Sequence, residues 1–186
     1  RLLEEQQDQI VKQSARLNAI FESSSHLVWT VDKNLNITSF NSNYSGVVNQ
    51  KYGIEVIANE PVLSKIKDKQ SREAYSDFWK PLYERAFKGE TVKTERHDLM
   101  DGGGNDVYRI IYLNPIYSDG EVVEISCLAN DITDIKKYEK RIIEQSSKLK
   151  AIFENGNQLF WTVNKNRELI TFNNRYSEAI HDIYGF

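Results

Sequence analysis

Hydrophobic and polar residues follow two different periods along this chain, and each change of period marks an expected element. Residues 1–22 carry apolar side chains at heptad spacing, which predicts an amphipathic helix. Short apolar and β-branched runs at 27–31 and 37–40 are separated by a mostly polar loop and predict a β-hairpin. Helical spacing returns at 71–88, where Pro81 should kink the helix or mark a boundary.

Capping residues and turns complete the expected order of elements. Asn41 is a good N-cap for a short helix that ends near Gly53, and Pro61 can open another short helix. Three strands joined by glycine-containing turns at 101–106 and 118–120 then follow, over 91–100, 107–113 and 122–130. This order predicts an α+β fold, with a five-stranded antiparallel sheet and helices on one face.

The chain also repeats itself at an offset of 132 residues. Residues 17–53 and 149–185 are identical at 17 of 37 positions. A match of this length and order indicates two copies of one module, each with its own core. We therefore expect four segments: an N-terminal helix at 1–22, a domain at 23–131, a linker helix at 132–154, and the truncated start of a second domain at 155–186.

The same heptad pattern precedes both copies of the repeat. A helix lying on its own domain would also show an apolar stripe, but we favour pairing in a homodimer because the seam is narrow and occurs twice. Two to three heptads are marginal for an isolated coiled coil, so the globular part must contribute to any dimer. The candidate dimer seam consists of Leu3, Ile10, Leu17, Ile135, Tyr138, Ile142 and Leu149.

Composition limits the classes of function. A net charge of -3 gives no electrostatic reason to expect nucleic acid or an anionic membrane as partner. No apolar run approaches the roughly 18 residues that cross a bilayer, and the lone Cys127 fits a reducing compartment. We expect a cytoplasmic location with no membrane contact by these residues. Because the chain opens on Arg1 and its single methionine is Met100, we also expect a piece of a longer protein.

Residues that carry catalytic or metal chemistry do not form a recognisable pattern. His26, His97 and His181 lie far apart and lack the i, i+4 partners of a helical metal site. The glycine run at 102–104 lacks the Lys-Ser or Lys-Thr of a phosphate-binding loop and is better explained as a hairpin tip. Cys127 falls in the last strand, where a small buried residue is expected. We predict no catalytic residues and no metal site.

Aromatic side chains supply a candidate site for a small ligand. They can surround a molecule between the sheet and the long helix, or they can simply fill the core. Core filling suits most of them better, because three recur in the second copy. The candidates are Trp29, Phe40, Tyr44, Phe78, Trp79 and Tyr112.

Several segments resemble the PAS family of sensory domains. Asn114–Val123 followed by Asp131–Glu139 resembles the family's final hairpin, its Asp-Ile-Thr junction and the charged signalling helix. Trp29–Asn41 resembles the opening hairpin and the asparagine that begins the next helix, and Phe87–Glu90 resembles the turn before the third strand. The resemblance covers residues 17–140 almost completely.

The resemblance implies a PAS fold and a sensory or dimerisation role in a multidomain signalling protein. The output domain in the same polypeptide would be a histidine kinase of a two-component system, with a cyclic-dinucleotide enzyme or a transcriptional regulator as the alternative. A ligand-independent scaffold for oligomerisation is the alternative role. Asp131, Ile132 and Thr133 would form the signal junction. On physical grounds Asp131 or Thr133 can cap the outgoing helix, and an ordinary cap without signalling content is the other interpretation.

The resemblance also bears on cofactors. Photosensory relatives that bind flavin use an Asn-Cys-Arg-Phe-like motif, and heme-binding relatives present a histidine from the long helix. Neither feature occurs in this sequence. We predict neither heme nor a covalent flavin adduct, and we leave an unknown small-molecule ligand open.

Overall fold

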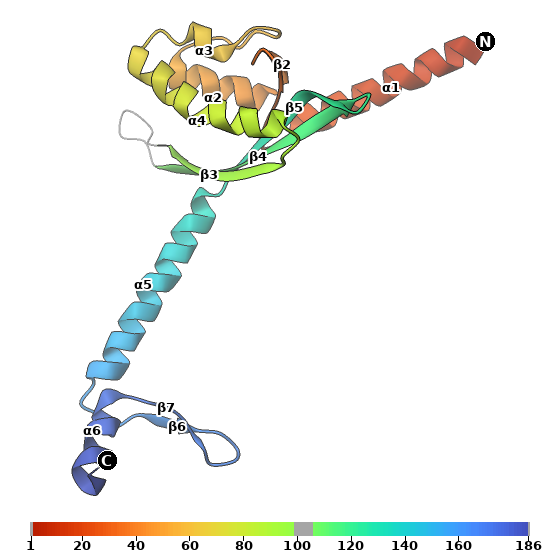
Figure 1. The fold of residues 1–186 in the computed structure, drawn as a ribbon. Helices are drawn as coiled ribbons and strands as arrows, with labels where there is room; N and C mark the ends of the chain where they lie inside the picture. The colour runs from red at the N-terminus through yellow and green to blue at the C-terminus, as the bar shows by residue number, and fades with distance from the viewer. Residues whose placement is uncertain (1, 99–105, 186) are drawn as a thin grey trace. The chain divides into compact units, whose positions relative to one another are not determined.

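A computed structural model describes residues 2–98 and 106–185 (Figure 1). They belong to two compact units, residues 1–133 and residues 134–186. The first unit holds α1 (Leu2–Ser23), β1 (Leu27–Asp32), β2 (Ile37–Phe40), α2 (Ser42–Tyr52), α3 (Val62–Lys65), α4 (Lys69–Phe87), β3 (Val92–Asp98), β4 (Val107–Ser118) and β5 (Glu121–Asp131). Helix α5 (Thr133–Asn155) leads into β6 (Trp161–Val163), β7 (Leu169–Phe172) and α6 (Asn174–Tyr184) of the second unit.

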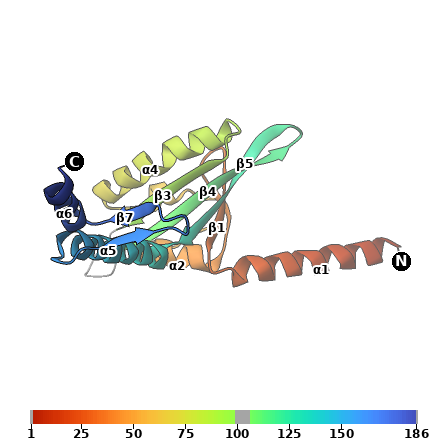
Figure 2. The same cartoon turned by 90° about the horizontal axis from the view of Figure 1, so that it is seen from below.

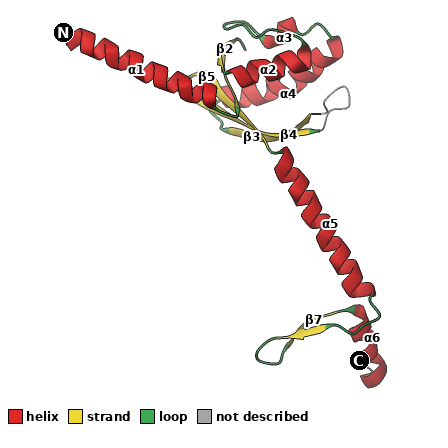
Figure 3. Ribbon diagram, turned by 180° about the vertical axis from the view of Figure 1, so that it is seen from behind, coloured by secondary structure: helices red, strands yellow, loops and turns green. Residues whose placement is uncertain are grey.

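The first unit is built on a five-stranded sheet with the order β2-β1-β5-β4-β3. Every neighbouring pair of strands is antiparallel. Helices α2, α3 and α4 lie on one face of this sheet (Figure 3). Helix α2 follows Asn41 and ends at Gly53, which has a left-handed conformation, and α3 follows Pro61. The structure therefore confirms the predicted α+β class and the predicted short helices.

Two prolines lie inside elements that the sequence predicted to end or bend there. Strand β4 continues through Pro115, although its predicted end was Leu113. Strand β3 pairs with β4 only up to Leu113, and beyond it β4 pairs with β5 alone in a projecting hairpin (Figure 2). Such an edge tolerates proline. Helix α4 continues through Pro81, which is therefore not a boundary, because burial of Trp79 and Tyr83 outweighs the local cost.

A buried asparagine joins the first hairpin to the helices on either side of it. The Asn41 Oδ1 accepts hydrogen bonds from the backbone N–H groups of Val28 and Tyr44, at 3.1 and 3.0 Å. Its Nδ2 donates to the carbonyl oxygens of Phe21 and His26, at 3.2 and 2.8 Å. One side chain therefore ties the end of α1 and the entrance of β1 to the start of α2.

The second unit repeats this hydrogen-bonding arrangement. Asn173 is fully buried and makes the corresponding four bonds to the backbone of Phe153, Gln158, Phe160 and Tyr176. The apolar side chains of its hairpin are more exposed, however. Trp161 is 53% exposed, whereas its counterpart Trp29 is 1% exposed. The repeated sequence thus reproduces the local structure without the burial that α4 provides in the first unit.

The structure bears on two further predictions, the glycine-rich turn and the absence of a membrane span. The glycine-rich turn expected at 101–106, with its hairpin tip at 102–104, lies outside the described residues apart from Asp106. Within residues 2–98 and 106–185, no helix combines the length and apolar character needed to cross a bilayer.

Candidate functional site

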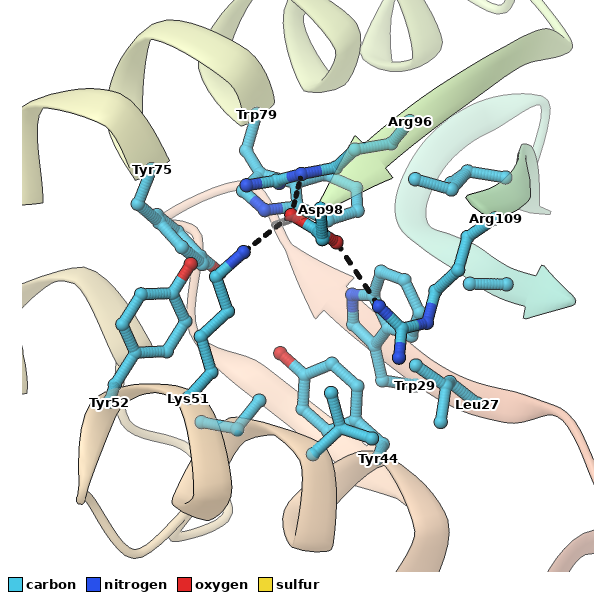
Figure 4. Close-up of a pocket in the computed structure, with 14 residues that line it drawn as sticks. Leu27, Trp29, Tyr44, Lys51, Tyr52, Tyr75, Trp79, Arg96, Asp98 and Arg109 are labelled. Atoms are coloured by element: carbon cyan, nitrogen blue, oxygen red, sulfur yellow. Dashed lines mark hydrogen bonds and ion pairs between the residues drawn. The ribbon is translucent and has the colours of Figure 1, made fainter. Parts of the chain in front are cut away.

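A small cavity lies between the sheet and helices α2 and α4 (Figure 4). Its volume is about 60 Å³. Most of the wall is apolar or aromatic, and it includes Leu27, Trp29, Tyr44, Tyr75, Trp79 and Ile111.

Three of the six predicted aromatic residues line this cavity. Trp29 stacks on Tyr44 with ring centroids 4.6 Å apart and meets Trp79 edge to face at 5.4 Å. Its indole N–H donates a hydrogen bond of 3.1 Å to the Tyr83 hydroxyl. These rings therefore belong to the hydrophobic core and form the cavity wall at the same time.

The other three predicted residues lie elsewhere. Phe40 and Phe78 are partly buried and pack against the core, and the ring of Phe78 lies 4.2 Å from the Arg96 guanidinium carbon. Tyr112 follows the buried Ile111 on β4, so strand alternation directs it to the opposite face of the sheet. Neither Phe40, Phe78 nor Tyr112 lines the cavity.

A cluster of charged side chains also borders the cavity. The Asp98 carboxylate accepts hydrogen bonds from Lys51 Nζ at 2.5 Å, Arg96 Nε at 2.8 Å and Arg109 Nη1 at 3.1 Å (Figure 4). The four residues come from α2, β3 and β4, and we name them the Asp98 cluster. Asp98 is only 8% exposed. Three positive charges share one negative charge, which leaves a formal charge of +2 among the described residues of the wall.

Burial and the neighbouring charges shift the pKa values of both Asp98 and Lys51. Burial alone would raise the pKa of Asp98, but the Lys51 hydrogen bond and the charges of Arg96, Lys51 and Arg109 hold that pKa below its usual value. Burial lowers the pKa of Lys51, and repulsion from the two arginines adds to this effect, although Asp98 opposes it. The lowered pKa of Asp98 is the direction expected where cations outnumber carboxylates, and the lowered pKa of Lys51 is the direction expected for a partly buried lysine.

Sequence reasoning missed the Asp98 cluster. On β3 polar residues occupy nearly every position, a pattern that usually marks a solvated strand. The available signal was the register around the turn, which places Arg96 directly opposite Arg109. Two like charges at opposed positions are unfavourable, so they indicate a nearby counter-ion.

Two hydrogen bonds tie the predicted junction to β4, and a third lies within the junction. Ile132 N–H donates to the Tyr108 carbonyl at 2.8 Å, and Tyr108 N–H donates to the Thr133 hydroxyl at 3.0 Å. Thr133 N–H donates to Asp131 Oδ1 at 2.8 Å. Asp131 therefore caps the first turn of α5, while the Thr133 side chain binds the neighbouring strand.

The cavity and the junction meet on β4. Arg109 of the Asp98 cluster directly follows Tyr108, the residue that bonds both Ile132 and Thr133. Arg109 also lies opposite Asp131 in the β4–β5 register. One peptide unit of β4 thus separates the cavity from the junction.

The predicted dimer seam is exposed in the single chain. Its exposed fractions range from 55% for Ile135 to 80% for Leu3. The seven positions are Leu3, Ile10, Leu17, Ile135, Tyr138, Ile142 and Leu149.

Metal-ligating side chains do not gather in the part of the chain that the structure describes, since no group of three or more His, Cys, Asp or Glu residues could hold an ion. His97 stacks on Tyr108 with ring centroids 4.3 Å apart and lies 3.2 Å from the Asp106 carboxylate. Cys127 is fully buried, and burial raises the pKa of its thiol well above the usual value. A buried thiol of this kind is unreactive.

Comparison with known proteins identifies the fold. No family model matches the sequence, and no curated protein matches it either. Among solved structures, the PAS domain of Bordetella pertussis BvgS aligns at 12% identity and a TM-score of 0.53, covering 74% of this chain and 98% of that chain. The chain has the PAS fold.

Two further solved structures align less closely. The PAS domain of an HTR-like protein from Haloarcula marismortui has 16% identity and a TM-score of 0.44, covering 69% of this chain and 99% of that chain. A domain of a putative light and redox sensing histidine kinase from the same organism has 23% identity and a TM-score of 0.41, covering 64% and 99%. The PAS assignment concerns the fold and rests on BvgS.

The pKa of Asp98 leads to a pH-dependent prediction. Its folded pKa is lowered, so its stabilising effect is complete above the unfolded value of about 4 and is lost as the pH falls through the folded value. Asp98→Asn should lower the free energy of unfolding by about 3 kcal/mol at pH 7, because the largely buried Arg96 and Arg109 and the partly exposed Lys51 lose their counter-ion. The difference from the parent should shrink below about pH 4.

Denaturant unfolding between pH 3 and 7 measures this difference. Glu90→Gln is the matched control, because Glu90 pairs with Arg85 on the exposed surface and should lose less stability. Equal unfolding free energies of Asp98→Asn and the parent at pH 7 would contradict the assigned role.

Proposed function

We propose that this chain is a sensory and dimerisation module of a multidomain signal-transduction protein in the cytoplasm. A ligand or partner would change the cavity, and the change would pass through β4 to the junction and α5. The output domain in the same polypeptide would be a histidine kinase of a two-component system. The alternative outputs are a cyclic-dinucleotide enzyme and a transcriptional regulator.

One observation carries this proposal: Arg109 and Tyr108 are neighbours on β4. Arg109 binds Asp98 at the cavity, and Tyr108 uses both its backbone N–H and its carbonyl oxygen at the junction. Thr133 and Ile132 are 9% and 8% exposed, so water cannot readily replace these bonds. A shift of β4 therefore has to be followed by the start of α5 or has to break buried hydrogen bonds.

The proposed relay would run along bonds between three elements. Lys51 and Asp98 link α2 to β3, and Asp98 and Arg109 link β3 to β4. A ligand that changes the spacing within the Asp98 cluster would alter the position of β4 relative to α2. Small displacements become discrete changes when the packed elements on either side cannot deform continuously.

Dimerisation is proposed through the exposed heptad stripes of α1 and α5. The exposed positions include Leu17 and Leu149, which occupy equivalent places before the two hairpins. An apolar stripe of this kind is stabilised by pairing with a second copy.

We also propose that residues 155–186 begin a second PAS module, because Asn173 reproduces the four hydrogen bonds of Asn41.

A ligand-independent scaffold is the second candidate function. The observation in its favour is the small volume of the cavity, about 60 Å³, together with the close packing of Trp29, Tyr44 and Trp79 around it. Such a scaffold would dimerise through the same helices. It would not need any coupling between the cavity and the junction.

The relay predicts that Thr133→Val loosens both the strand and the helix. The substitution keeps the side-chain shape but removes the hydroxyl that accepts the Tyr108 N–H. Loss of about 1 kcal/mol should make the Tyr108 amide exchange with solvent about fivefold faster. Exchange in the first turn of α5 should accelerate with it.

Site-resolved hydrogen exchange gives both rates. Thr94→Val on β3 is the matched control and should change neither region. If the Tyr108 amide alone responds and the first turn of α5 keeps the parent rate, the helix is not coupled to β4 and the relay is wrong.

The dimer seam is tested by Ile142→Asp. Ile142 occupies an a position of the heptad pattern and is 65% exposed in the single chain. A charge there would be buried by pairing, so the dimer dissociation constant should rise at least about tenfold while the sheet stays folded. Ser147→Asp adds the same charge at the f position, farthest from the seam, and should leave the constant unchanged. Sedimentation equilibrium measures both, and equal constants for the two variants would exclude this seam.

A further inference from the structure

The first turn of α2 is capped in part by a side chain of the preceding helix. The Glu22 carboxylate, at the end of α1, accepts hydrogen bonds from the Ser42 N–H at 3.0 Å and from the Ser42 hydroxyl. Ser42 is the first residue of α2, so its N–H has no partner within the helix. A negative charge at this end also interacts favourably with the helix dipole. Helix α1 therefore completes the N-terminal cap of α2.

Two asparagines hold the same corner together. Asn41 Nδ2 donates to the carbonyl oxygen of Phe21 in α1, and Asn43 Nδ2 donates to the carbonyl oxygen of Ser24, just after α1, at 2.6 Å. Asn41 is fully buried, whereas Glu22 is exposed. An exposed carboxylate can exchange its partners for water at little cost. The Glu22 contact can therefore open while the buried asparagine keeps the corner folded.

The second unit repeats the carboxylate contact. Glu154, near the end of α5, accepts a hydrogen bond of 3.1 Å from the N–H of Asn174, the first residue of α6. Glu154 and Asn174 lie 132 residues after Glu22 and Ser42, which is the offset of the internal repeat. The contact is therefore a feature of the repeated module.

Helix α2 connects this corner to the Asp98 cluster. Ser42 begins the helix, and Lys51 lies in its last turn, where Lys51 Nζ binds the Asp98 carboxylate. The helix has only 11 residues, so a tilt at its first turn also displaces its last turn. The position of α1 can thus reach the cluster through a single short helix.

We propose that Glu22 and Ser42 form a latch through which the position of α1 controls the Asp98 cluster. The latch would regulate the sensory site proposed above, and its role rests on that proposed function. While it is closed, α1 and α2 move together, and once it opens, only the asparagine bonds join them. Leu17 of the proposed dimer seam lies within two helical turns of Glu22, so rotation of α1 in a dimer would act on the latch.

Hydrogen exchange in Glu22→Ala tests the latch itself. Alanine preserves the helix propensity of α1 and removes the carboxylate, so the Ser42 amide should exchange about threefold faster or more. Asp8→Ala removes the same charge from the same helix, away from the corner, and should keep the parent rate. An unchanged Ser42 rate in Glu22→Ala would overturn the latch.

Exchange of the Tyr108 amide tests control of the Asp98 cluster. In Glu22→Ala this amide should exchange about twofold faster or more, because α2 no longer holds Lys51 in a fixed position. If the effect passes through the cluster, Glu22→Ala should add no further change in a Lys51→Met protein. An unchanged Tyr108 rate in Glu22→Ala, or equal increments in both backgrounds, would overturn this control. The comparison of Glu22→Ala with Asp8→Ala holds even if Lys51→Met is poorly folded.

The repeated contact is tested by Glu154→Ala. The Asn174 amide should exchange about twofold faster or more in this variant, because it loses its acceptor. Glu144→Ala, at an exposed position of α5, is the matched control and should keep the parent rate. An unchanged Asn174 rate in Glu154→Ala would overturn the latch in the second unit.

These variants separate the latch from the proposed relay. Unchanged rates at Ser42 and Tyr108 in Glu22→Ala overturn the latch, while the response of the first turn of α5 to Thr133→Val still decides the relay. Conversely, a first turn of α5 that ignores Thr133→Val contradicts the relay. Faster exchange at Ser42 and Tyr108 in Glu22→Ala would then still support control of the Asp98 cluster by α1.

Discussion

The pairing of β4 with β5 is the constraint on which the rest of the structure depends. The register runs without interruption from Arg109 opposite Asp131 to Ile116 opposite Glu124, which fixes the end of the sheet where α5 begins. Backbone bonds at Tyr108 hold both Ile132 and Thr133, so they tie the start of α5 to β4. The same strand contributes Arg109 to the cavity, so one element serves both sites.

The buried asparagines provide a second constraint, where each preceding helix meets its hairpin. Asn41 binds the Phe21 carbonyl at the end of α1, and Asn173 binds the Phe153 carbonyl near the end of α5. Helix α5 is therefore held by side-chain hydrogen bonds close to both of its ends, at Thr133 and at Phe153. The proposed relay would pass a rotation or translation along this helix.

The sequence predicted what depends on local signals. Asn41 and Gly53 marked both ends of α2, and the repeat predicted the second hairpin, because caps and turns act through neighbouring residues. It did not predict the path of β4 through Pro115, which depends on where β3 stops pairing. It also missed the Asp98 cluster. Its members lie on three elements, and burial of Asp98 follows from how α2 packs on the sheet, which no local pattern encodes.

Hydrogen exchange at the junction in Lys51→Met tests the central claim most directly, because Lys51 lies on α2 and the change touches neither β4 nor α5. Coupling through the Asp98 cluster predicts faster exchange of the Tyr108 and Ile132 amides, by about threefold or more. The Lys65→Met protein, altered at an ion pair on α3, should keep the parent rates. Unchanged rates at both amides in a folded Lys51→Met protein would contradict the account, because the cavity would then be isolated from the junction.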